Sequence, residues 1–297
     1  YKIIHEKKYN IDGQLIYRGY PINYLVNKQP SDKICGFEET AYLLIFGTLP
    51  NADQLKIFKD YLLHFKMGPV DLQYETPNIL NALQIEVLKL YAKDPSADTD
   101  DLEERMMKGL KILASIPLFT FSYARNKVFK SYPYPDRSLA ENILCMARGN
   151  DQYTFEEAKI MDTLLMVHAD HGGGNNSTFA NVVISSTGTD IYSCISAAIG
   201  SLKGPKHGGA NCKVTNMFKA IFHEVGFTTD KATLKKIANR ILDKDFFDHS
   251  GLIYGIGHAI YTKSDPRALL IHEQCEALAK SKGQEEIYNC IHAFEKV

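Results

Sequence analysis

Apolar residues at helical spacing limit, more than any other feature, what this 297-residue chain can fold into. In segment 98–114 leucine and methionine recur every three or four positions, so they share one face of a helix, and acidic residues crowd its first turn, where they complement the helix dipole. Segments 37–46 and 229–242 show the same spacing. Strand-like alternation is scarce, and its best example lies near 13–20. The sequence therefore predicts a mostly α fold.

Local signals predict where helices begin and end. Gly47 follows the 37–46 segment and is a natural left-handed helix stop. Thr154 with Glu157 three residues later forms a capping box, and Asp190 can cap a helix that runs to Leu202. Pro117 is expected to end or kink the helix that begins near position 98, because proline lacks an amide hydrogen.

The candidate domain boundary is the glycine-rich turn at 204–209, since the chain contains neither a repeat of fixed period nor a low-complexity linker. A second group of helices is expected after this turn. We therefore predict a larger helical domain over 1–203 and a smaller helical domain over 204–297.

Composition excludes several functional classes. The 34 Lys and Arg residues balance 35 Asp and Glu residues, which argues against a dedicated nucleic-acid binder, and no apolar run approaches the length of a membrane span. The six cysteines include no C-x-x-C pair, so a disulfide framework or structural zinc site is not expected and a reducing, cytoplasmic location is preferred.

Four of the ten histidines stand beside glycines in three segments: H-A-D-H-G-G-G (168–174), G-P-K-H-G-G-A-N (204–211) and G-I-G-H (255–258). Glycine lets the backbone approach a ligand closely, and histidine offers a proton near neutral pH. These segments are therefore the candidate functional turns. The other histidines, among them His272 and His292, are expected to be surface or packing residues.

Each segment also has a simpler interpretation. His168 and His171, three apart at a helix end, could share a face and hold a metal or an anion, or could only interact with the helix dipole. His207 precedes an expected helix start, where amides favour negative charge, but could belong to a plain interdomain turn. Arg267 could hold a carboxylate or only pair with Asp265 on the surface.

Taken together, segments 168–178, 204–211 and 255–267 resemble the three signature stretches of citrate synthases, in the same order, and segments 13–20 and 37–50 also look familial. The resemblance implies a homodimer whose subunits have a large and a small helical domain around an active-site cleft. It also implies an acyltransferase of the tricarboxylic acid cycle that condenses acetyl-CoA with oxaloacetate and hydrolyses citryl-CoA to citrate and CoA. No cofactor or metal is implied, since acetyl-CoA is a substrate.

The resemblance assigns roles to individual positions. His207 would hydrogen-bond the thioester oxygen while the methyl group loses its proton, and His258 would polarise the ketone of oxaloacetate. Such donors suit the chemistry, because both oxygens gain negative charge. The substrate-binding residues would be His171, Arg267, His168 and Asn175. The CoA adenine would lie near the backbone of Leu252, Ile253, Tyr254, Gly255, Ile256 and Gly257.

One departure from the family pattern concerns the base. In the family it is an aspartate in a D-[FY]-Y-S-G-like stretch after the D-P-R turn, and no such stretch follows Arg267 here. The similar D-F-F-D-H-S-G at 245–251 precedes His258, which is the wrong order. The sequence thus predicts a C-terminally truncated citrate synthase that lacks its catalytic aspartate and, as written, is inactive or very slow.

Three alternatives stay open at this point. A 2-methylcitrate synthase would use propionyl-CoA, a difference of one methylene that is worth about 1–3 kcal/mol in an apolar pocket. A metallohydrolase using His168, His171 and another histidine would contain stoichiometric metal. A non-catalytic module would bind acyl-CoA or a dicarboxylate without turnover.

Overall fold

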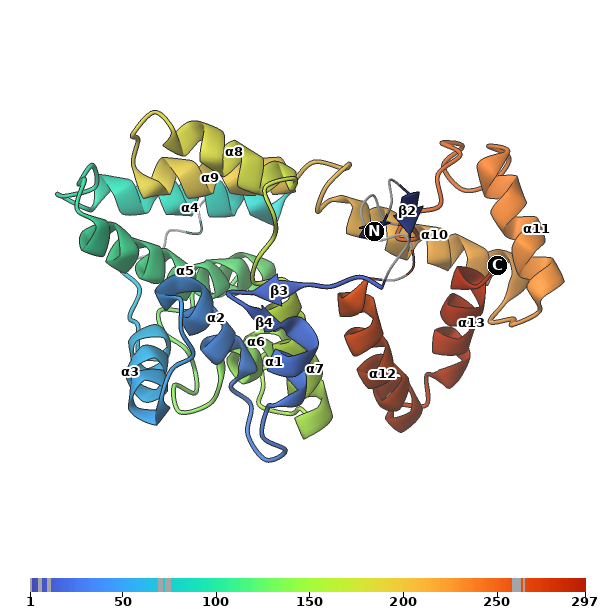
Figure 1. Ribbon diagram of the computed structural model, residues 1–297, viewed down its shortest axis with the longest axis horizontal. Helices are drawn as coiled ribbons and strands as arrows, with labels where there is room; N and C mark the ends of the chain where they lie inside the picture. The colour runs from blue at the N-terminus through green and yellow to red at the C-terminus, as the bar shows by residue number, and fades with distance from the viewer. Residues whose placement is uncertain are drawn as a thin grey trace. The chain divides into compact units, whose positions relative to one another are not determined.

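The computed structural model describes residues 2–4, 7–9, 12–68, 72, 76–257, 263 and 265–297. Over these residues it is mostly helical, as predicted, with thirteen helices and two small antiparallel sheets (Figure 1). The chain forms two compact units, Ile16–Lys203 and Gly204–Val297, the second of which also includes Tyr1–Leu15. The predicted domains, 1–203 and 204–297, differ from these units in the placement of the first fifteen residues.

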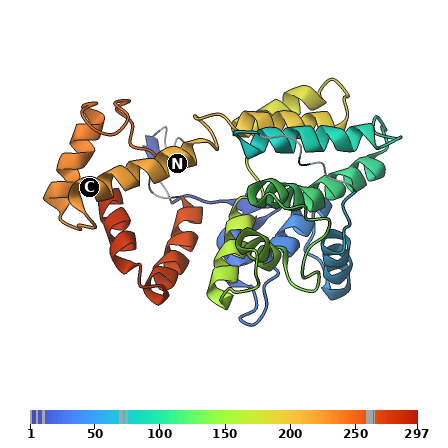
Figure 2. The same cartoon turned by 180° about the vertical axis from the view of Figure 1, so that it is seen from behind.

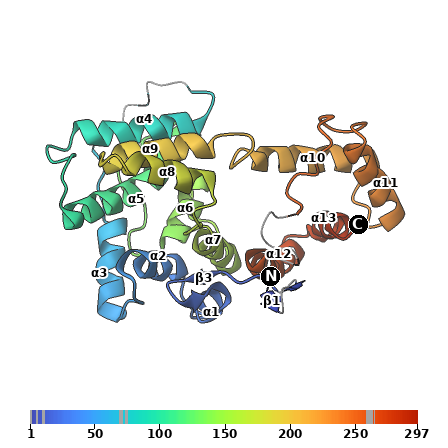
Figure 3. The same cartoon turned by 45° about the horizontal axis from the view of Figure 1, so that its top comes forward.

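The unit Ile16–Lys203 begins with a short hairpin and continues as helices. Strands β3 (Ile16–Tyr17) and β4 (Tyr20–Pro21) pair around Arg18 and Gly19, both with positive φ, in the segment where the sequence showed strand-like alternation. The helices of the unit are α1 (Ile22–Asn27), α2 (Gly36–Phe46), α3 (Ala52–Leu63), α4 (Ile79–Ala92), α5 (Leu102–Arg125), α6 (Leu139–Arg148), α7 (Phe155–Val167), α8 (Asn176–Ser185) and α9 (Ile191–Leu202). Helix α9 packs against both α4 and α8 (Figure 3).

The capping signals mark true helix ends. Thr154 and Glu157 form the predicted capping box at the start of α7, and Asp190 accepts a hydrogen bond from the amide of Ser193 at the start of α9. Gly47 ends α2 with a φ of 83°. These features involve residues only three or four positions apart, which is why the sequence predicts them.

The expectation for Pro117 is wrong in part, because α5 does not end there but continues to Arg125. Proline inside a helix costs about 3 kcal/mol. The turns that follow it bury Leu118 and Phe119 almost completely, and burial of each such side chain contributes about 1.5–3 kcal/mol. Tertiary burial therefore outweighs the local penalty.

Two buried carboxylates tie three helices of this unit together. Asp162 of α7 accepts hydrogen bonds from the backbone amides of Gly36 and Phe37, each at 2.9 Å, at the start of α2. Glu38 of α2 accepts one from the amide of Leu139, also at 2.9 Å, at the start of α6. Each carboxylate thus satisfies amides that a helix start leaves without intrahelical partners.

The second unit contains α10 (Ala210–Val225), α11 (Lys231–Leu242), α12 (Pro266–Ser281) and α13 (Glu285–Glu295), with the two-stranded pairing of β1 (Lys2–Ile4) and β2 (Lys7–Tyr9). Its core comes from α10, α11 and α13 and includes Met217, Ile221, Leu234, Cys290 and Phe294. Helix α12 buries none of its residues and packs against α13 as a helical hairpin (Figure 2). Across the described part of the chain, no helix is long and apolar enough to cross a membrane.

Candidate functional site

His168 and His171 lie at the end of α7 and differ in their surroundings. Helix α7 stops at Val167, so His168 is its C-cap, and the His168 Nδ1 atom lies 2.7 Å from the carbonyl oxygen of Leu164. His171 lies in the loop beyond, exposed, with its Nδ1 3.3 Å from the carbonyl of Gly172. The two rings therefore do not share a helix face, and His168 makes the contact with the helix end that the simpler interpretation anticipated.

Asn175 is the N-cap of α8. Its side-chain oxygen accepts hydrogen bonds from the amides of Ser177 at 2.9 Å and Thr178 at 3.2 Å. The Thr178 hydroxyl in turn donates to the carbonyl of His171 at 3.4 Å. The loop that carries His171 is thus fastened to the first turn of α8.

His207 lies in the turn directly before α10, as predicted. Its amide donates to the carbonyl of Gly204 at 2.9 Å, and the amide of Gly209 donates to the same oxygen at 3.2 Å. The residue is half-buried. Helix α10 begins at Ala210 behind Gly209, which has no side chain to cap it, so its first amides can favour negative charge near His207.

The segment 252–257 packs on the first turns of α10. Gly255 has a φ of 80°, and a Cβ atom on it would lie 2.9 Å from the Cγ2 atom of Val214. Leu252 and Ile256 are exposed, so the segment presents backbone and apolar side chains to solvent. Glycine fits this close approach because it has no side chain. The contact with Val214 places the predicted CoA segment beside α10, the helix that follows His207.

A polar network that the sequence did not reveal holds this segment. Asp248 accepts hydrogen bonds from Lys213 Nζ at 2.9 Å, from the Tyr254 hydroxyl at 2.8 Å and from the Ser250 hydroxyl at 2.7 Å. Among these residues only Tyr254 lies in a predicted site segment. The network joins positions 35 residues apart, so no local spacing could have indicated it.

The backbone beside this network contains non-glycine residues in the left-handed region. Lys244, Phe247 and His249 have φ values of 62°, 65° and 55°. Such conformations cost energy and concentrate where the surrounding structure must hold a loop in one shape. The loop that leads into segment 252–257 is therefore held in one conformation.

The hydrogen bonds on Asp248 also decide its protonation. Those from Ser250 and then Lys213 lower the pKa of this carboxyl, although its partial burial works in the opposite direction. A carboxylate held so strongly in its charged form is a poor proton acceptor near neutral pH. The hydrogen bonds on Asp248 thus argue, together with the sequence order, against Asp248 as the base.

Arg267 is the second residue of α12 and pairs with Asp265, the N-cap of that helix. Its Nε lies 3.0 Å from Oδ1 and its Nη2 lies 2.6 Å from Oδ2. The ion pair that the sequence offered as the simpler interpretation is therefore present, and it holds the guanidinium in one orientation. His258, the other predicted catalytic residue, lies outside the described residues.

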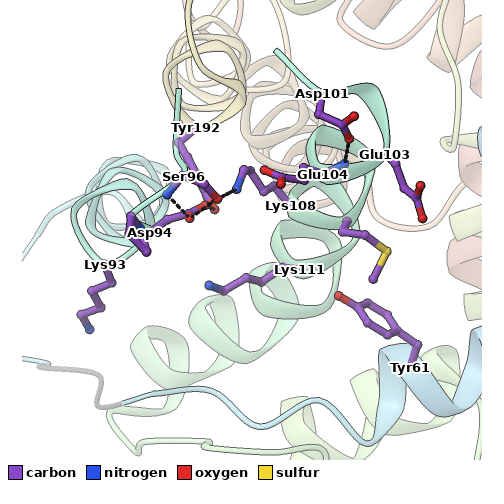
Figure 4. A pocket seen from close by; sticks show the side chains of 12 residues that line it. Tyr61, Lys93, Asp94, Ser96, Asp101, Glu103, Glu104, Lys108, Lys111 and Tyr192 are labelled. Atoms are coloured by element: carbon purple, nitrogen blue, oxygen red, sulfur yellow. Dashed lines mark hydrogen bonds and ion pairs between the residues drawn. The ribbon is translucent and has the colours of Figure 1, made fainter. Parts of the chain in front are cut away.

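A cavity of about 640 Å³ lies elsewhere, in the unit Ile16–Lys203 (Figure 4). Its polar wall centres on Asp94, which is bonded to Lys108 at 2.8 Å and to the Tyr192 hydroxyl at 2.7 Å. Burial would raise the pKa of Asp94, but these hydrogen bonds outweigh it and the pKa is lowered. None of the predicted site residues that the structure describes lines this cavity.

The described site residues thus fall into two groups. The unit Gly204–Val297 contains His207, Arg267 and the segment 252–257, with the segment packed on α10 directly after His207. The unit Ile16–Lys203 contains His168, His171 and Asn175 around the loop between α7 and α8. In both groups some of the residues, His171, His207 and the segment 252–257, lie in glycine-containing turns or loops, where functional residues are often found.

Comparison with known proteins identifies the family of this helical protein. Residues 3–297 match the family model described as "Citrate synthase, C-terminal domain". The chain belongs to the citrate synthase family.

Individual relatives agree with this assignment. The chain is 35% identical to the citrate synthase of Haloferax volcanii, over 96% of this chain and 73% of that protein. It is 31% identical to 2-methylcitrate synthase 1 of Corynebacterium glutamicum, over 96% of this chain and 72% of that protein. The crystal structure of citrate synthase from Pyrobaculum aerophilum matches with a TM-score of 0.76 and 26% identity, over 96% of this chain and 70% of that chain.

Proposed function

We propose that this protein is an acyltransferase that condenses acetyl-CoA with oxaloacetate and hydrolyses the resulting thioester to citrate and CoA. The observation that carries the proposal is the family match over residues 3–297, which includes all three glycine–histidine segments. The TM-score of 0.76 to a solved citrate synthase supports the same fold.

His207 would act on the acetyl-CoA side of the reaction. A thioester methyl group is a very weak acid, so its deprotonation needs a hydrogen-bond donor on the oxygen that becomes an enolate. The half-buried imidazole of His207 stands at the start of α10, where the first amides add positive potential. Segment 252–257, packed on the same helix, would receive the CoA adenine.

Oxaloacetate would be held by cationic and polar side chains. Arg267 supplies parallel N–H donors that match a carboxylate, and its pairing with Asp265 orients the guanidinium before substrate arrives. His171 would bind the same substrate, with His168 and Asn175 beside it in sequence. His258 would donate to the ketone oxygen as this oxygen gains negative charge.

A second candidate is 2-methylcitrate synthesis from propionyl-CoA. It is favoured by the 31% identity to 2-methylcitrate synthase 1 of Corynebacterium glutamicum. Because the two acyl groups differ by one methylene, the expected preference is about 1–3 kcal/mol, or roughly tenfold to 200-fold in kcat/KM.

A metallohydrolase on His168 and His171 finds little support. The His168 ring is bonded to a backbone carbonyl, and among the described residues neither histidine belongs to a group of three side chains arranged to hold an ion. A binding module without turnover is the other outcome that the activity test distinguishes.

The test measures release of the CoA thiol, with oxaloacetate and either acetyl-CoA or propionyl-CoA, by the full-length gene product. We expect acetyl-CoA to be preferred, and His207→Ala to lower kcat by about 10²–10³-fold. His223→Ala is the matched control, because His223 is exposed near the other end of α10. Absence of thiol release with both acyl-CoAs, or full activity of His207→Ala, would contradict the proposal.

The same family membership motivates three further parts of the proposal: a homodimer, a cytoplasmic location and a place in the tricarboxylic acid cycle. Light scattering coupled to size-exclusion chromatography tests the first of these. A monomer that releases CoA at a normal rate would refute the homodimer.

A further inference from the structure

The helical hairpin of α12 and α13 brings three potential metal ligands together. His272 lies on α12, whereas His292 and Glu295 lie three residues apart on one face of α13. The His272 Nε2 and His292 Nδ1 atoms are 2.5 Å apart, and His292 Nδ1 is 3.7 Å from a carboxylate oxygen of Glu295. All three ligand atoms lie within 4.8 Å of one another.

Tyr288 orients the His272 ring from behind. Its hydroxyl lies 2.7 Å from His272 Nδ1 and 3.3 Å from the His272 carbonyl oxygen. If the hydroxyl hydrogen points to the carbonyl, the phenol oxygen accepts the Nδ1 hydrogen. The Nε2 lone pair then faces His292. Metal-binding histidines commonly have this arrangement, in which the outer nitrogen donates to a second residue that fixes the ring.

The two observed separations bracket the value expected for a tetrahedral site. Zinc lies about 2.0–2.2 Å from imidazole nitrogens and carboxylate oxygens, so two ligand atoms of a tetrahedral ion are about 3.3 Å apart. The observed 2.5 and 3.7 Å lie on either side of that value. Small side-chain rotations would make them equal, and solvent can reach the site, because both histidines are half-buried and Glu295 is exposed.

We propose that this hairpin binds one divalent transition-metal ion, of the zinc type, through His272 Nε2, His292 Nδ1 and a carboxylate oxygen of Glu295, with water as the fourth ligand. Two imidazoles and one carboxylate suit Zn²⁺ and its neighbours in the first transition row, whereas Mg²⁺ and Ca²⁺ prefer oxygen ligands.

The ion would fasten α12 to its unit. None of the residues Pro266–Ser281 is buried, although α13 inserts Cys290 and Phe294 into the core. A metal bridge between the two helices would link α12, which begins with the Asp265–Arg267 pair, to that core through α13. The site is therefore a structural clamp and not part of the chemistry proposed above.

Titration calorimetry of the EDTA-treated, full-length protein with Zn²⁺ tests this site, and substitution with Co²⁺ gives an independent visible absorption band. We expect one equivalent to bind, and Mg²⁺ and Ca²⁺ not to compete. His272→Gln and His292→Gln should weaken this site at least 100-fold, and Tyr288→Phe should weaken it about tenfold, since outer partners of metal ligands contribute about 10–100-fold to affinity.

His64→Gln is the matched control, because His64 faces Asp60 at 3.9 Å on α3 but has no third ligand among the described residues. Its Zn²⁺ affinity should equal that of the unchanged protein. Far-ultraviolet circular dichroism without metal establishes that each variant is folded. If the unchanged protein binds no Zn²⁺ at 100 μM, or if the His272→Gln and His292→Gln variants keep the site, the cluster is a hydrogen-bonded histidine pair only and the proposal is overturned.

Discussion

Two clusters of titratable side chains, one in each compact unit, are built in opposite ways. Glu38 and Asp162 are 0% and 4% exposed, and backbone amides bind both Asp162 oxygens and one Glu38 oxygen. His272 and His292 are half-buried, with ring nitrogens that face each other beside the exposed Glu295. The buried carboxylates, the sealed cluster, bind the amides of two helix starts, whereas the ring nitrogens of the open histidine cluster lie where solvent and a ligand can reach them.

The sealed cluster is also electrostatically costly. Burial and the neighbouring Glu38 charge raise the pKa of Asp162 to about 7, and burial raises the pKa of Glu38 as well. The amide hydrogen bonds oppose this shift without cancelling it. The pair therefore stabilises the fold through its hydrogen bonds and destabilises it through its charge, and the following changes separate the two effects.

Removal of the Asp162 carboxyl should have the largest effect. In Asp162→Ala the buried amides of Gly36 and Phe37 lose their acceptor, and each unpaired buried group costs about 1–3 kcal/mol, so the free energy of unfolding should fall by about 4 kcal/mol. Urea denaturation followed by circular dichroism measures it. Asp162→Asn keeps one acceptor oxygen and should lose about half as much. A loss below about 1 kcal/mol in the alanine variant would show that the cluster does not hold the helices.

Raising the pH should have the next largest effect. The folded-state pKa of Asp162, about 7, exceeds the ordinary value of 3.8, so the folded protein binds more protons than the unfolded chain between these values. Its free energy of unfolding should therefore fall as the pH rises from 5 to 8, by about 3 kcal/mol from this group.

Asp162→Asn should flatten that pH dependence, because it removes the titrating group while Lys59 and Glu141 keep their charges near Glu38. Denaturant midpoints of both proteins at several pH values provide the measurement. Equal slopes for the two proteins would rule out Asp162 as the source.

Gly36→Ala should disturb the sealed cluster by about 2 kcal/mol, the typical cost of overpacking. A Cβ atom there would lie 2.4 Å from the Met166 sulfur and 2.6 Å from an Asp162 oxygen. Gly68→Ala is the control, because a Cβ atom at Gly68 meets nothing within 4 Å. Equal unfolding free energies for the two variants would mean that the cluster accommodates the added methyl group without loss of stability, contrary to this prediction.

The open cluster should respond least in the absence of metal. His272→Gln exchanges a half-buried hydrogen bond for contact with water, so the free energy of unfolding in EDTA should change by less than about 1 kcal/mol. With Zn²⁺ at a hundred times its dissociation constant, the unchanged protein should gain about 3 kcal/mol that this variant lacks. A large loss in EDTA would instead make the histidine pair a core element, like Asp162.

The parts of this protein that the sequence predicted well are those set by nearby residues. Gly47, Thr154 and Asp190 mark helix ends in the structure because caps join positions three or four apart. The sequence also predicted, from neighbouring residues alone, that His207 lies directly before a helix, and this helix is α10. The roles of the site residues stay predictions. The helix expected to end or kink at Pro117 does not end there, because burial beyond Pro117 outweighs the local penalty.

The sequence alone determined a mostly helical chain with histidines in glycine turns, because hydrophobic spacing and capping act over one or two turns of helix. Only the tertiary structure decided that Asp162 binds the amides of Gly36 and Phe37, which are 126 and 125 positions away along the chain. The same holds for the hydrogen bonds by which Asp248 holds the loop before segment 252–257 and for the contact between His272 and His292. Such pairings depend on how helices pack, and packing joins side chains whose separation along the chain leaves no periodic signal.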